Sequence, residues 1–464
     1  MNKEDRILLV DPKSITHGPP EIIRKQDQAL SKFYSLTLDE AINKMLDNSF
    51  LSLHNYNAVS NRCISNYGLL MLGQLFKEAG AEVDYVNGDY YEDQSNFYSS
   101  IVNKAEECYA LCFTATTPQY LDVKNIAERL RVLFPNKLLV YGGPHAYFFK
   151  NHYESNPFHL ICIGYDIKKS GNKILELIQK HTLPDKCLLY NATGYTDLAK
   201  DFSLIPLNYL RETLLYSYIS FGCPNKCRYC IEHYFSEKIC SLHLEHKLEE
   251  IKFLINKAKV RVIHLADSDF FINPRFASDF LDMLEKQGLN CCFTVNTSPK
   301  VICKKETASL IKRFVKNGLV EILIGVEYLS EKELSYMNKK YSISDFYSVL
   351  SDIRESTPEL IVSFYSLIGL PGESKFSIEE NVLWTLKFKE SLLFDFSFPK
   401  YFVPYPGSEI FEYPEKYKVE ILHRKWDEYH RWSLPRPIRI NGVSDDVFTD
   451  ELLALYNVSN VSIN

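Results

Sequence analysis

The stretch Cys223-Pro224-Asn225-Lys226-Cys227-Arg228-Tyr229-Cys230 decides how the second half of the chain is interpreted. A structural zinc site usually takes four protein ligands, often from two separated C-x-x-C pairs. No such fourth ligand is evident nearby, because His233 follows too closely and Cys240 belongs to no pair. Three thiolates on one loop can instead bind three irons of a 4Fe–4S cluster and leave the fourth iron open, whereas ferredoxins fill all four positions. The alternatives are a degenerate zinc loop or a chance spacing.

Length and composition indicate a globular protein of more than one domain. A chain of 464 residues is too long for one ordinary core, so we expect two or three domains. Hydrophobic residues make up 46% and charged residues 24% of the chain, which is typical of folded proteins. The formal net charge is −6 without a block of like charges, which disfavours a basic nucleic-acid-binding surface.

The sequence contains no apolar stretch of membrane-spanning length, and the apolar run at Ile7–Val10 is too short for a signal peptide. We therefore expect a cytoplasmic protein with no membrane partner. Its twelve cysteines would stay reduced there, either as ligands or as buried thiols. Outside the motif they show no C-x-x-C spacing, so further clusters are not expected.

The first part of the chain alternates strands with helices. Strands are expected at Ile7–Val10, Glu82–Val86, Tyr109–Phe113, Lys137–Tyr141 and Leu160–Ile163, and helices at Gly68–Glu78, Leu121–Leu133 and Lys173–Gln179. This alternation indicates a parallel, doubly wound, Rossmann-like α/β domain over residues 1–180. Such sheets bind ligands beyond the carboxyl ends of their strands, where this chain has its loops of glycine and small polar residues.

A second alternating series follows an irregular stretch. Pro184, Gly194 and Pro206 interrupt residues 181–210, which we assign to a linker. Strands are then expected at Ser217–Phe221, Arg261–Ala266, Cys292–Val295, Glu321–Gly325, Ile361–Ile368 and Phe396–Val403. Six strand–helix units are too few for a closed eight-stranded barrel, so residues 211–412 are predicted to form an open (β/α)6 partial barrel, followed by a capping region at 413–464.

Several barrel segments, in the expected order, resemble the radical S-adenosylmethionine (SAM) superfamily. Tyr229 stands directly before the third cysteine, as in the family motif. The strand ends carry Asp267 and Asp269, then Gly325-Val326-Glu327, and then the turn Ile368-Gly369-Leu370-Pro371-Gly372-Glu373. Each segment alone is a weak signal, since Gly-Leu-Pro-Gly is usually a simple turn. Together with Cys223, Cys227 and Cys230 they are specific.

The resemblance implies a 4Fe–4S cluster on the three cysteines and SAM bound at its open iron. The positions matching the family's SAM site are Tyr229, Asp267, Asp269, Asn296, Glu327, Ile368, Gly369 and Gly372. The carboxylates would accept hydrogen bonds from the ammonium group of SAM, and the glycines would let backbone approach the adenine. Reduction of the cluster would cleave SAM to a 5′-deoxyadenosyl radical, so an electron donor such as flavodoxin or ferredoxin is implied as a partner.

The first domain resembles the cobalamin-binding domain that precedes the barrel in one large radical SAM class. The matching positions are Tyr67, Thr114, Thr116, Thr117, Gly142, Gly143, His145 and Gly164. The Asp-x-His-x-x-Gly motif of other B12 proteins is absent, as is usual in this class. Where many relatives read Gly-Glu-Gly-Glu, this chain has Gly164-Tyr165-Asp166-Ile167.

The function implied by both resemblances is cobalamin-dependent methyl transfer to an unactivated carbon of a small-molecule or peptide natural product. A second hypothesis is a radical cyclisation, dehydration or rearrangement in which the B12-type domain is structural. A methylthiotransferase would need three further cluster cysteines and an RNA-binding domain. A non-enzymatic iron–sulfur or cobalamin sensor is the remaining alternative.

Overall fold

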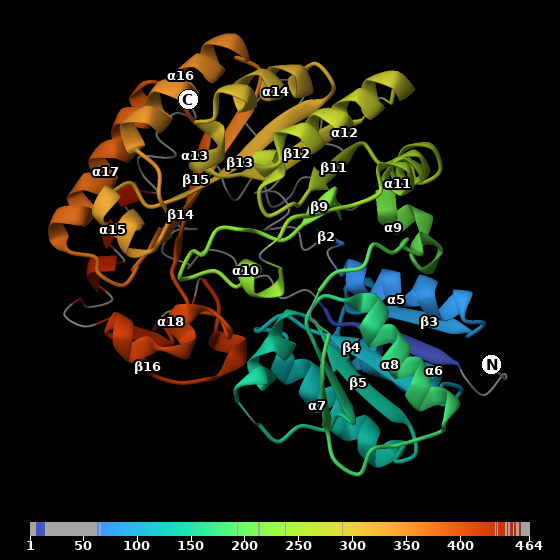
Figure 1. Ribbon diagram of the computed structural model, residues 1–464. Helices are drawn as coiled ribbons and strands as arrows, with labels where there is room; N and C mark the ends of the chain where they lie inside the picture. Colours follow the sequence, from blue (N-terminus) through green and yellow to red (C-terminus); the bar gives the residue numbers. More distant parts are fainter. Residues whose placement is uncertain are drawn as a thin grey trace.

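The computed structural model describes residues 6–13, 63–64, 66–152, 154–192, 194–211, 214–236, 238–289, 291–431, 433, 435–440, 443, 446–448, 450–451 and 454–455. Two parallel sheets, each covered by helices, lie one beside the other, with α10 (Glu232–Phe235) in the region between them (Figure 1). The α/β class with a doubly wound domain and a partial barrel is confirmed. Within the described residues, no helix combines the length and the apolar character needed to cross a bilayer.

The N-terminal sheet has six parallel strands in the order β3-β1-β4-β5-β6-β7. Its strands are β1 (Ile7–Asp11), β3 (Val83–Asn87), β4 (Ala110–Thr114), β5 (Leu138–Gly142), β6 (Leu160–Ile163) and β7 (Leu188–Asn191). The helices between them are α5 (Tyr67–Glu78), α6 (Gln94–Ala105), α7 (Tyr120–Leu133) and α8 (Ile167–Gln179).

Alternating side chains of these strands pack on opposite faces of the sheet. In β1, Ile7 and Leu9 share a core with α5 and α8, whereas Leu8 and Val10 share a core with α6 and α7. Both faces are therefore covered, which explains why β1 is apolar without interruption from position 7 to position 10. The carboxyl ends of the strands remain for ligands.

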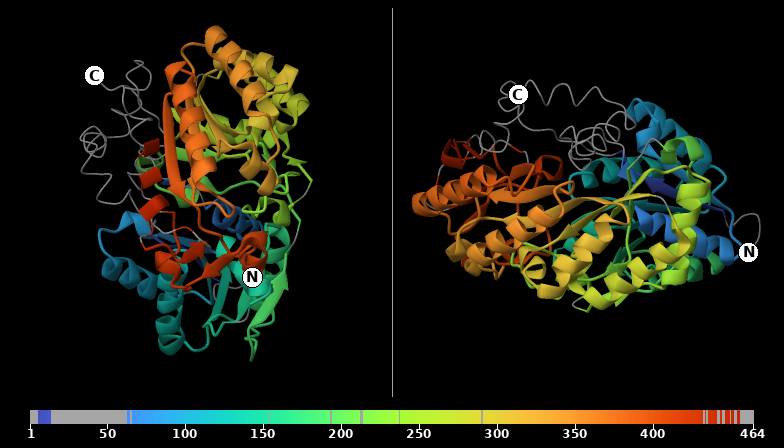
Figure 2. Two further views of the ribbon diagram at one scale, coloured as in Figure 1. Left: turned by 90° about the vertical axis from the view of Figure 1, so that its left-hand side faces the viewer. Right: turned by 90° about the horizontal axis from the view of Figure 1, so that it is seen from above.

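The second sheet is an open barrel of parallel strands in the order β15-β14-β13-β12-β11-β8-β2. Its strands are β2 (Cys63–Ile64), β8 (Leu214–Ser217), β11 (Val262–Leu265), β12 (Cys292–Thr297), β13 (Leu319–Glu327), β14 (Ile361–Ile368) and β15 (Phe396–Tyr401). The longer helices are α11 (Leu244–Asn256), α12 (Pro274–Gln287), α14 (Lys305–Val315), α16 (Ile343–Ser356) and α17 (Lys375–Glu390), and the shorter ones include α13 (Pro299–Ile302) and α15 (Glu331–Tyr336). Figure 2 shows these helices lying along the outside of the barrel sheet.

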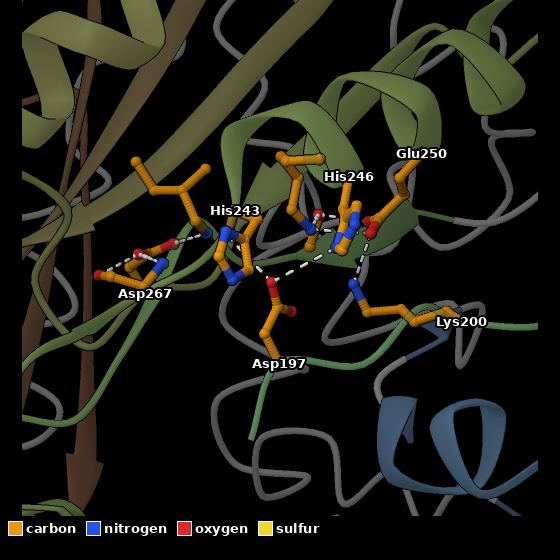
Figure 3. Close-up of polar contacts among 10 residues, drawn as sticks. Asp197, Lys200, His243, His246, Glu250 and Asp267 are labelled. Carbon is orange, nitrogen blue, oxygen red and sulfur yellow. Dashed lines mark hydrogen bonds and ion pairs between the residues drawn. The ribbon is translucent and has the colours of Figure 1, made fainter. Parts of the chain in front are cut away.

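The first barrel strand differs from the prediction. The expected strand Ser217–Phe221 is split, because β8 ends at Ser217 and β9 (Ser220–Phe221) turns away to pair antiparallel with β10 (Cys240–Ser241). The backbone N–H groups of Ile219 and Ser220 donate instead to the Asp267 carboxylate at 3.0 and 2.6 Å (Figure 3). The cysteine loop therefore follows this hairpin strand and not the barrel strand itself.

Other elements were not anticipated. β2 adds a seventh strand to the edge of the barrel beside β8, and helices α6 and α16 were missed. The range 181–210, assigned to a linker, contains β7, which pairs with β6 and extends the first sheet. It also contains the short helix α9 (Leu207–Arg211). The linker proper is thus shorter than the sequence suggested.

The segment after the barrel packs between the two domains. It contains α18 (Glu409–Glu412) and a hairpin of β16 (Val419–Ile421) and β17 (Ile438–Ile440). The rings of Trp426 and His145 have centroids 5.0 Å apart, and Trp426 lies 5.1 Å from Phe148. Its aromatic residues therefore join the core of the N-terminal domain.

Candidate active site

One cavity of about 550 Å³ opens between the N-terminal domain and the barrel. Cys223, Cys227 and Cys230 line it from the barrel side. Facing them are loops at the carboxyl ends of β4, β5 and β6, which contribute Thr114, Gly143 and other residues. Ligands of doubly wound sheets bind at this edge, so the cavity brings both predicted sites into one space.

The cysteine loop is fixed by its own backbone. The Cys223 N–H donates to the Ser236 carbonyl at 3.0 Å, and the Cys230 N–H donates to the Cys227 carbonyl at 3.0 Å. Gly222 precedes the motif with φ of +92°, and a Cβ there would overlap the Lys238 carbonyl. Only glycine fits this approach of the hairpin to the loop.

The three thiols line a shared cavity, but they do not converge on one point. Among the described residues, no three His, Cys, Asp or Glu side chains are grouped closely enough to hold a single metal ion. In a cubic cluster each thiolate binds a different iron, so the ligands surround a larger core. Three thiols on the wall of one cavity are a donor set that such a cluster can use.

The surroundings of the thiols influence their ionisation. Burial raises the pKa of Cys223 to about 11 and also raises the pKa of Cys227. The positive charge of Lys339 and a hydrogen bond with Tyr229 oppose the rise in the pKa of Cys227. Bound iron would reverse this rise in pKa, because metal-bound thiols are deprotonated.

Glu327, Lys339 and Tyr229 form a connected polar group in the cavity wall. Lys339 Nζ lies 3.1 Å from Glu327 Oε1 and donates to the Tyr229 hydroxyl at 3.2 Å. Burial acts to lower the pKa of Lys339, but the charges of Glu327 and Cys227 outweigh it and raise the pKa. Glu327 follows a register shift in β13 and has φ of +64°, a conformation that costs about 1–3 kcal/mol for a non-glycine residue. Such strain at a strand end is typical of a functional position.

Of the two predicted aspartates, Asp269 lines the cavity and Asp267 does not. Asp269 accepts a hydrogen bond from Thr297 at 2.9 Å and another from Ser298. Burial raises the pKa of Asp269 to about 6 and that of Asp267 also to about 6. The Asp267 carboxylate accepts hydrogen bonds from the backbone N–H groups of Ile219 and Ser220, so it holds the strand before the cysteine loop and does not line the cavity.

Asn296 also lines the cavity, as the sequence predicted. Its Nδ2 lies 3.2 Å from His264 Nε2, and its Oδ1 is buried with no hydrogen-bond partner in the described part of the chain. A buried amide oxygen without a partner costs about 1–3 kcal/mol. This atom therefore favours a ligand that donates a hydrogen bond, such as an ammonium or a hydroxyl group.

The predicted adenine turn lies outside the cavity lining. Ile368, Gly369 and Gly372 do not appear among the described residues that line it. The backbone N–H of Gly369 donates to Glu373 Oε2 at 3.0 Å, so this carboxylate closes the turn. A Cβ on Gly372 would contact the Tyr336 ring at 3.1 Å. These glycines accommodate neighbouring protein groups.

Some of the residues predicted to bind cobalamin line the cavity, and others do not. Tyr67, Thr114, Gly142, Gly143 and Gly164 line the cavity. Thr116, Thr117 and His145 do not.

Each of these three has a structural role instead. The Thr116 hydroxyl donates to Gln119 Oε1 at 2.7 Å near the start of α7. Thr117 Oγ1 lies 3.2 Å from His145 Nδ1. The His145 ring is fully buried and lies among Tyr120, Phe148 and Trp426. It belongs to the aromatic core and does not face the cavity.

Several lining residues were not singled out from the sequence. They are Tyr165, Tyr195, Tyr218, Phe221, Glu232, Ser268, Lys339 and Tyr365. Burial raises the pKa of Glu232, whose Oε2 accepts a hydrogen bond from Ser268 at 3.0 Å. Tyr165, Glu232 and Ser268 carried a positional hint, because they flank predicted motif residues.

Residues 217–384 match the family model of the radical SAM superfamily. An uncharacterized methyltransferase of Pyrococcus horikoshii is 21% identical over 68% of this chain and 71% of its own length. An anaerobic magnesium-protoporphyrin IX monomethyl ester cyclase of Cereibacter sphaeroides is 24% identical, over 58% of this chain and 47% of that protein.

Among solved structures, the radical SAM methyltransferase TsrM from Kitasatospora setae, with cobalamin and a 4Fe–4S cluster bound, has a similar fold. The two chains are 14% identical and superpose with a TM-score of 0.64, and the aligned region covers 97% of this chain and 91% of TsrM. The barrel of the present chain is thus a radical SAM domain. The match covers residues 217–384 of the chain, and the fold of the whole chain, with a doubly wound domain before the barrel, is similar to that of TsrM. The family's cofactors, a 4Fe–4S cluster and SAM, therefore belong to this barrel.

Proposed function

We propose that this protein cleaves SAM reductively at a 4Fe–4S cluster and transfers a methyl group, with cobalamin, to an unactivated carbon of a small-molecule or peptide natural product. The observation that carries the proposal is the shared cavity. It has the three cysteine thiols on one side and the carboxyl-end loops of a B12-type sheet on the other. A methyl carrier and a radical source would then act on one substrate in a space largely screened from water.

On the barrel side, the chain offers polar groups suited to the methionyl part of SAM. Asp269 would accept hydrogen bonds from its ammonium group, and the unpartnered Oδ1 of Asn296 would accept another. Glu327 would bind the ribose hydroxyls, held in place by its ion pair with Lys339 at 3.1 Å. When bound, the cluster and SAM supply one-electron chemistry, while these residues orient the reacting atoms.

On the other side, the N-terminal domain offers a smooth, glycine-lined surface for cobalamin. A Cβ on Gly143 would come within 3.0 Å of the Ala115 backbone and would overlap Thr114 Oγ1. Gly142 and Gly164 line the same surface. Tyr165, which replaces the acidic residue of many relatives, is half-buried near Glu232 and Cys230 and would present a ring between the two cofactors.

The cluster would receive its electron through a second cleft on the other side of Cys227. That cleft, of about 280 Å³, is lined by Lys226, Lys300, Lys339 and Lys340, and the described residues around it include no acidic side chain. A positive surface in a chain with net charge −6 complements an acidic carrier such as flavodoxin or ferredoxin. Such carriers are cytoplasmic, and we infer the same location here.

Anaerobic reconstitution with iron, sulfide and cobalamin tests the proposal. After reduction with dithionite, we expect 5′-deoxyadenosine, S-adenosylhomocysteine and a methylated product. The double variant Thr114→Val with Gly143→Val should lose cobalamin and S-adenosylhomocysteine but still cleave SAM. Protein that binds no cobalamin after reconstitution would refute methyl transfer, and protein without SAM cleavage would refute the whole proposal.

A radical cyclisation without B12 turnover is the second candidate. One of the relatives is named a cyclase, which favours it. The two candidates differ in their co-products, because cyclisation gives 5′-deoxyadenosine without S-adenosylhomocysteine. The ratio of these two nucleosides in a single assay therefore separates the two reactions.

A further inference from the structure

A carboxylate without an ion pair lines the cavity between the two domains. It belongs to Glu232, which begins α10, the short helix in the region between the two sheets (Figure 1). Its side chain is half-buried, and its Oε2 accepts a hydrogen bond from the Ser268 hydroxyl at 3.0 Å. Ser268 lines the same cavity. Within the described part of the chain, the Glu232 carboxylate makes this hydrogen bond and no ion pair with a lysine or arginine.

The charged side chains that line the cavity leave negative charge uncompensated. Those of the described residues are Glu232, Asp269, Glu327 and Lys339. Lys339 lies 3.1 Å from Glu327 and forms an ion pair with it. Asp269 would bind the ammonium group of SAM, so Glu232 is left without a positive partner. Once a ligand shields this carboxylate from water, it needs such a partner, because a buried charge is stable only when it is paired. The cavity therefore favours a second cationic group.

Three stacked aromatic rings form another part of the cavity wall. The ring of Phe221 stacks with that of Tyr195, with centroids 4.2 Å apart, and with that of Tyr218, with centroids 4.6 Å apart. All three residues line the cavity, and we call them the aromatic wall. The faces of aromatic rings attract cations, and the attraction is stronger where water is excluded. Aromatic rings and a carboxylate in one cavity are therefore suited to an organic ammonium group.

The aromatic wall and the carboxylate come from adjacent segments. Phe221 stands two residues before Cys223, whose N–H donates to the Ser236 carbonyl at 3.0 Å. The N–H of Ser236 in turn donates to the Glu232 carbonyl at 3.4 Å. The strand that carries Phe221 is thus joined to the helix that begins at Glu232, and both segments face the same cavity.

We propose that Glu232 binds a protonated amine of the substrate, and that the aromatic wall packs against the carbon atoms next to this amine. The statement that the cation belongs to the substrate rests on the proposed function. SAM also carries an ammonium group, and the experiment must separate these two sources. Position favours the substrate, because Asp269 and Asn296 offer acceptor groups to SAM from the ends of barrel strands, whereas Glu232 stands between the two domains.

The test compares wild-type protein with Glu232→Gln, which keeps the shape of the side chain and an oxygen for the Ser268 hydroxyl but removes the charge. The matched control is Glu412→Gln, because Glu412 is also half-buried and accepts a hydrogen bond, from Asn151 Nδ2 at 2.9 Å, but lies outside the described cavity lining. The probes are benzylamine and benzyl alcohol, which share a shape and differ in charge at neutral pH. Both are titrated into cluster-loaded protein saturated with SAM, and equilibrium binding and thermal unfolding are measured.

We expect benzylamine to bind wild type and Glu412→Gln and to raise their unfolding temperatures. It should bind Glu232→Gln about tenfold or more weakly, because a hydrogen bond between two charged groups is lost. Benzyl alcohol should bind all three proteins equally and more weakly than benzylamine binds wild type. The affinity for SAM should be the same in Glu232→Gln and wild type.

Three results would overturn the inference. Benzylamine that binds wild type no better than benzyl alcohol would show that the cavity has no ammonium site, and this comparison needs no variant. Equal benzylamine affinity in wild type and Glu232→Gln would place the site elsewhere. A tenfold loss of SAM affinity in Glu232→Gln would assign the carboxylate to SAM. None of these measurements needs turnover, so failure here is distinct from failure to cleave SAM or to bind cobalamin.

Discussion

Replacing Gly143 by alanine should separate the two halves of the proposed active site. Gly143 has φ of +91° and ψ of −178°, a region of backbone space that is essentially reserved for glycine and costs another residue about 1–3 kcal/mol. A Cβ would also come within 3.0 Å of both the nitrogen and the oxygen of the Ala115 backbone, so the loop must move. For a domain of this size, about 1 kcal/mol lowers the melting temperature by about 2–4 °C, so we expect a decrease of about 2–12 °C.

The assay is differential scanning fluorimetry combined with the amount of cobalamin that remains bound after reconstitution. Movement of the loop after β5 should remove cobalamin, while dithionite-driven release of 5′-deoxyadenosine continues at the barrel. Gly80→Ala is the control for strain alone, because Gly80 has φ of +84° and open space around its Cβ position. Gly142→Ala is the control for the same loop without strain, and it should keep its melting temperature. If Gly143→Ala has the melting temperature and the cobalamin content of wild type, the loop after β5 does not hold cobalamin.

Three further predictions follow from the same geometry. Cys227→Ala should lose iron and SAM cleavage, whereas Cys303→Ala, which alters a half-buried thiol outside the cavity lining, should keep both in iron analysis and nucleoside assays. Burial raises the pKa of Asp11 from 3.8 to about 7, so ionisation of its carboxyl group destabilises the folded protein progressively as the pH rises from about 4 to 7. The stability of Asp11→Asn relative to wild type should therefore increase by up to about 4 kcal/mol between pH 4 and 8, as measured by urea titrations. A stability difference that does not change with pH would contradict this prediction. Lys300→Glu combined with Lys340→Glu should slow SAM cleavage driven by reduced flavodoxin but not by dithionite, and equal loss with both reductants would show a damaged cluster instead.

Much of the fold was readable from the sequence because its strands are short apolar runs between polar turns. The β1 strand is an example, since burial on both faces requires apolar residues throughout. The predicted first barrel strand ended four residues after β8 does, because the end of β8 depends on a distant group. Asp267 withdraws the backbone of Ile219 and Ser220 from the sheet, and no local pattern reveals this contact. β2 is only two residues long and gives no periodic signal.

Site residues that belong to a recognisable motif could be predicted from the sequence. Residues whose orientation depends on tertiary packing could not. The cysteines, Asp269 and Glu327 stand at strand ends within recognisable motifs, and the structure places them around one cavity. His145 also stands at a strand end, yet its ring turns into the aromatic core because Trp426 packs against it.

Helix α5 connects the two halves of the molecule more firmly than a hinge would. Its Leu69, Leu72 and Phe76 pack under the first sheet, whereas its Leu70 and Met71 belong to the barrel core. A buried ion pair of 2.6 Å joins Lys200, in the segment that connects the two domains, to Glu250 of α11 (Figure 3). Separating the two domains would expose the apolar surface of α5 to water. We therefore expect that a large substrate enters the cavity through movement of the loops around its opening, without separation of the domains. A substrate larger than the opening would have to bind by inserting one extended end into the cavity.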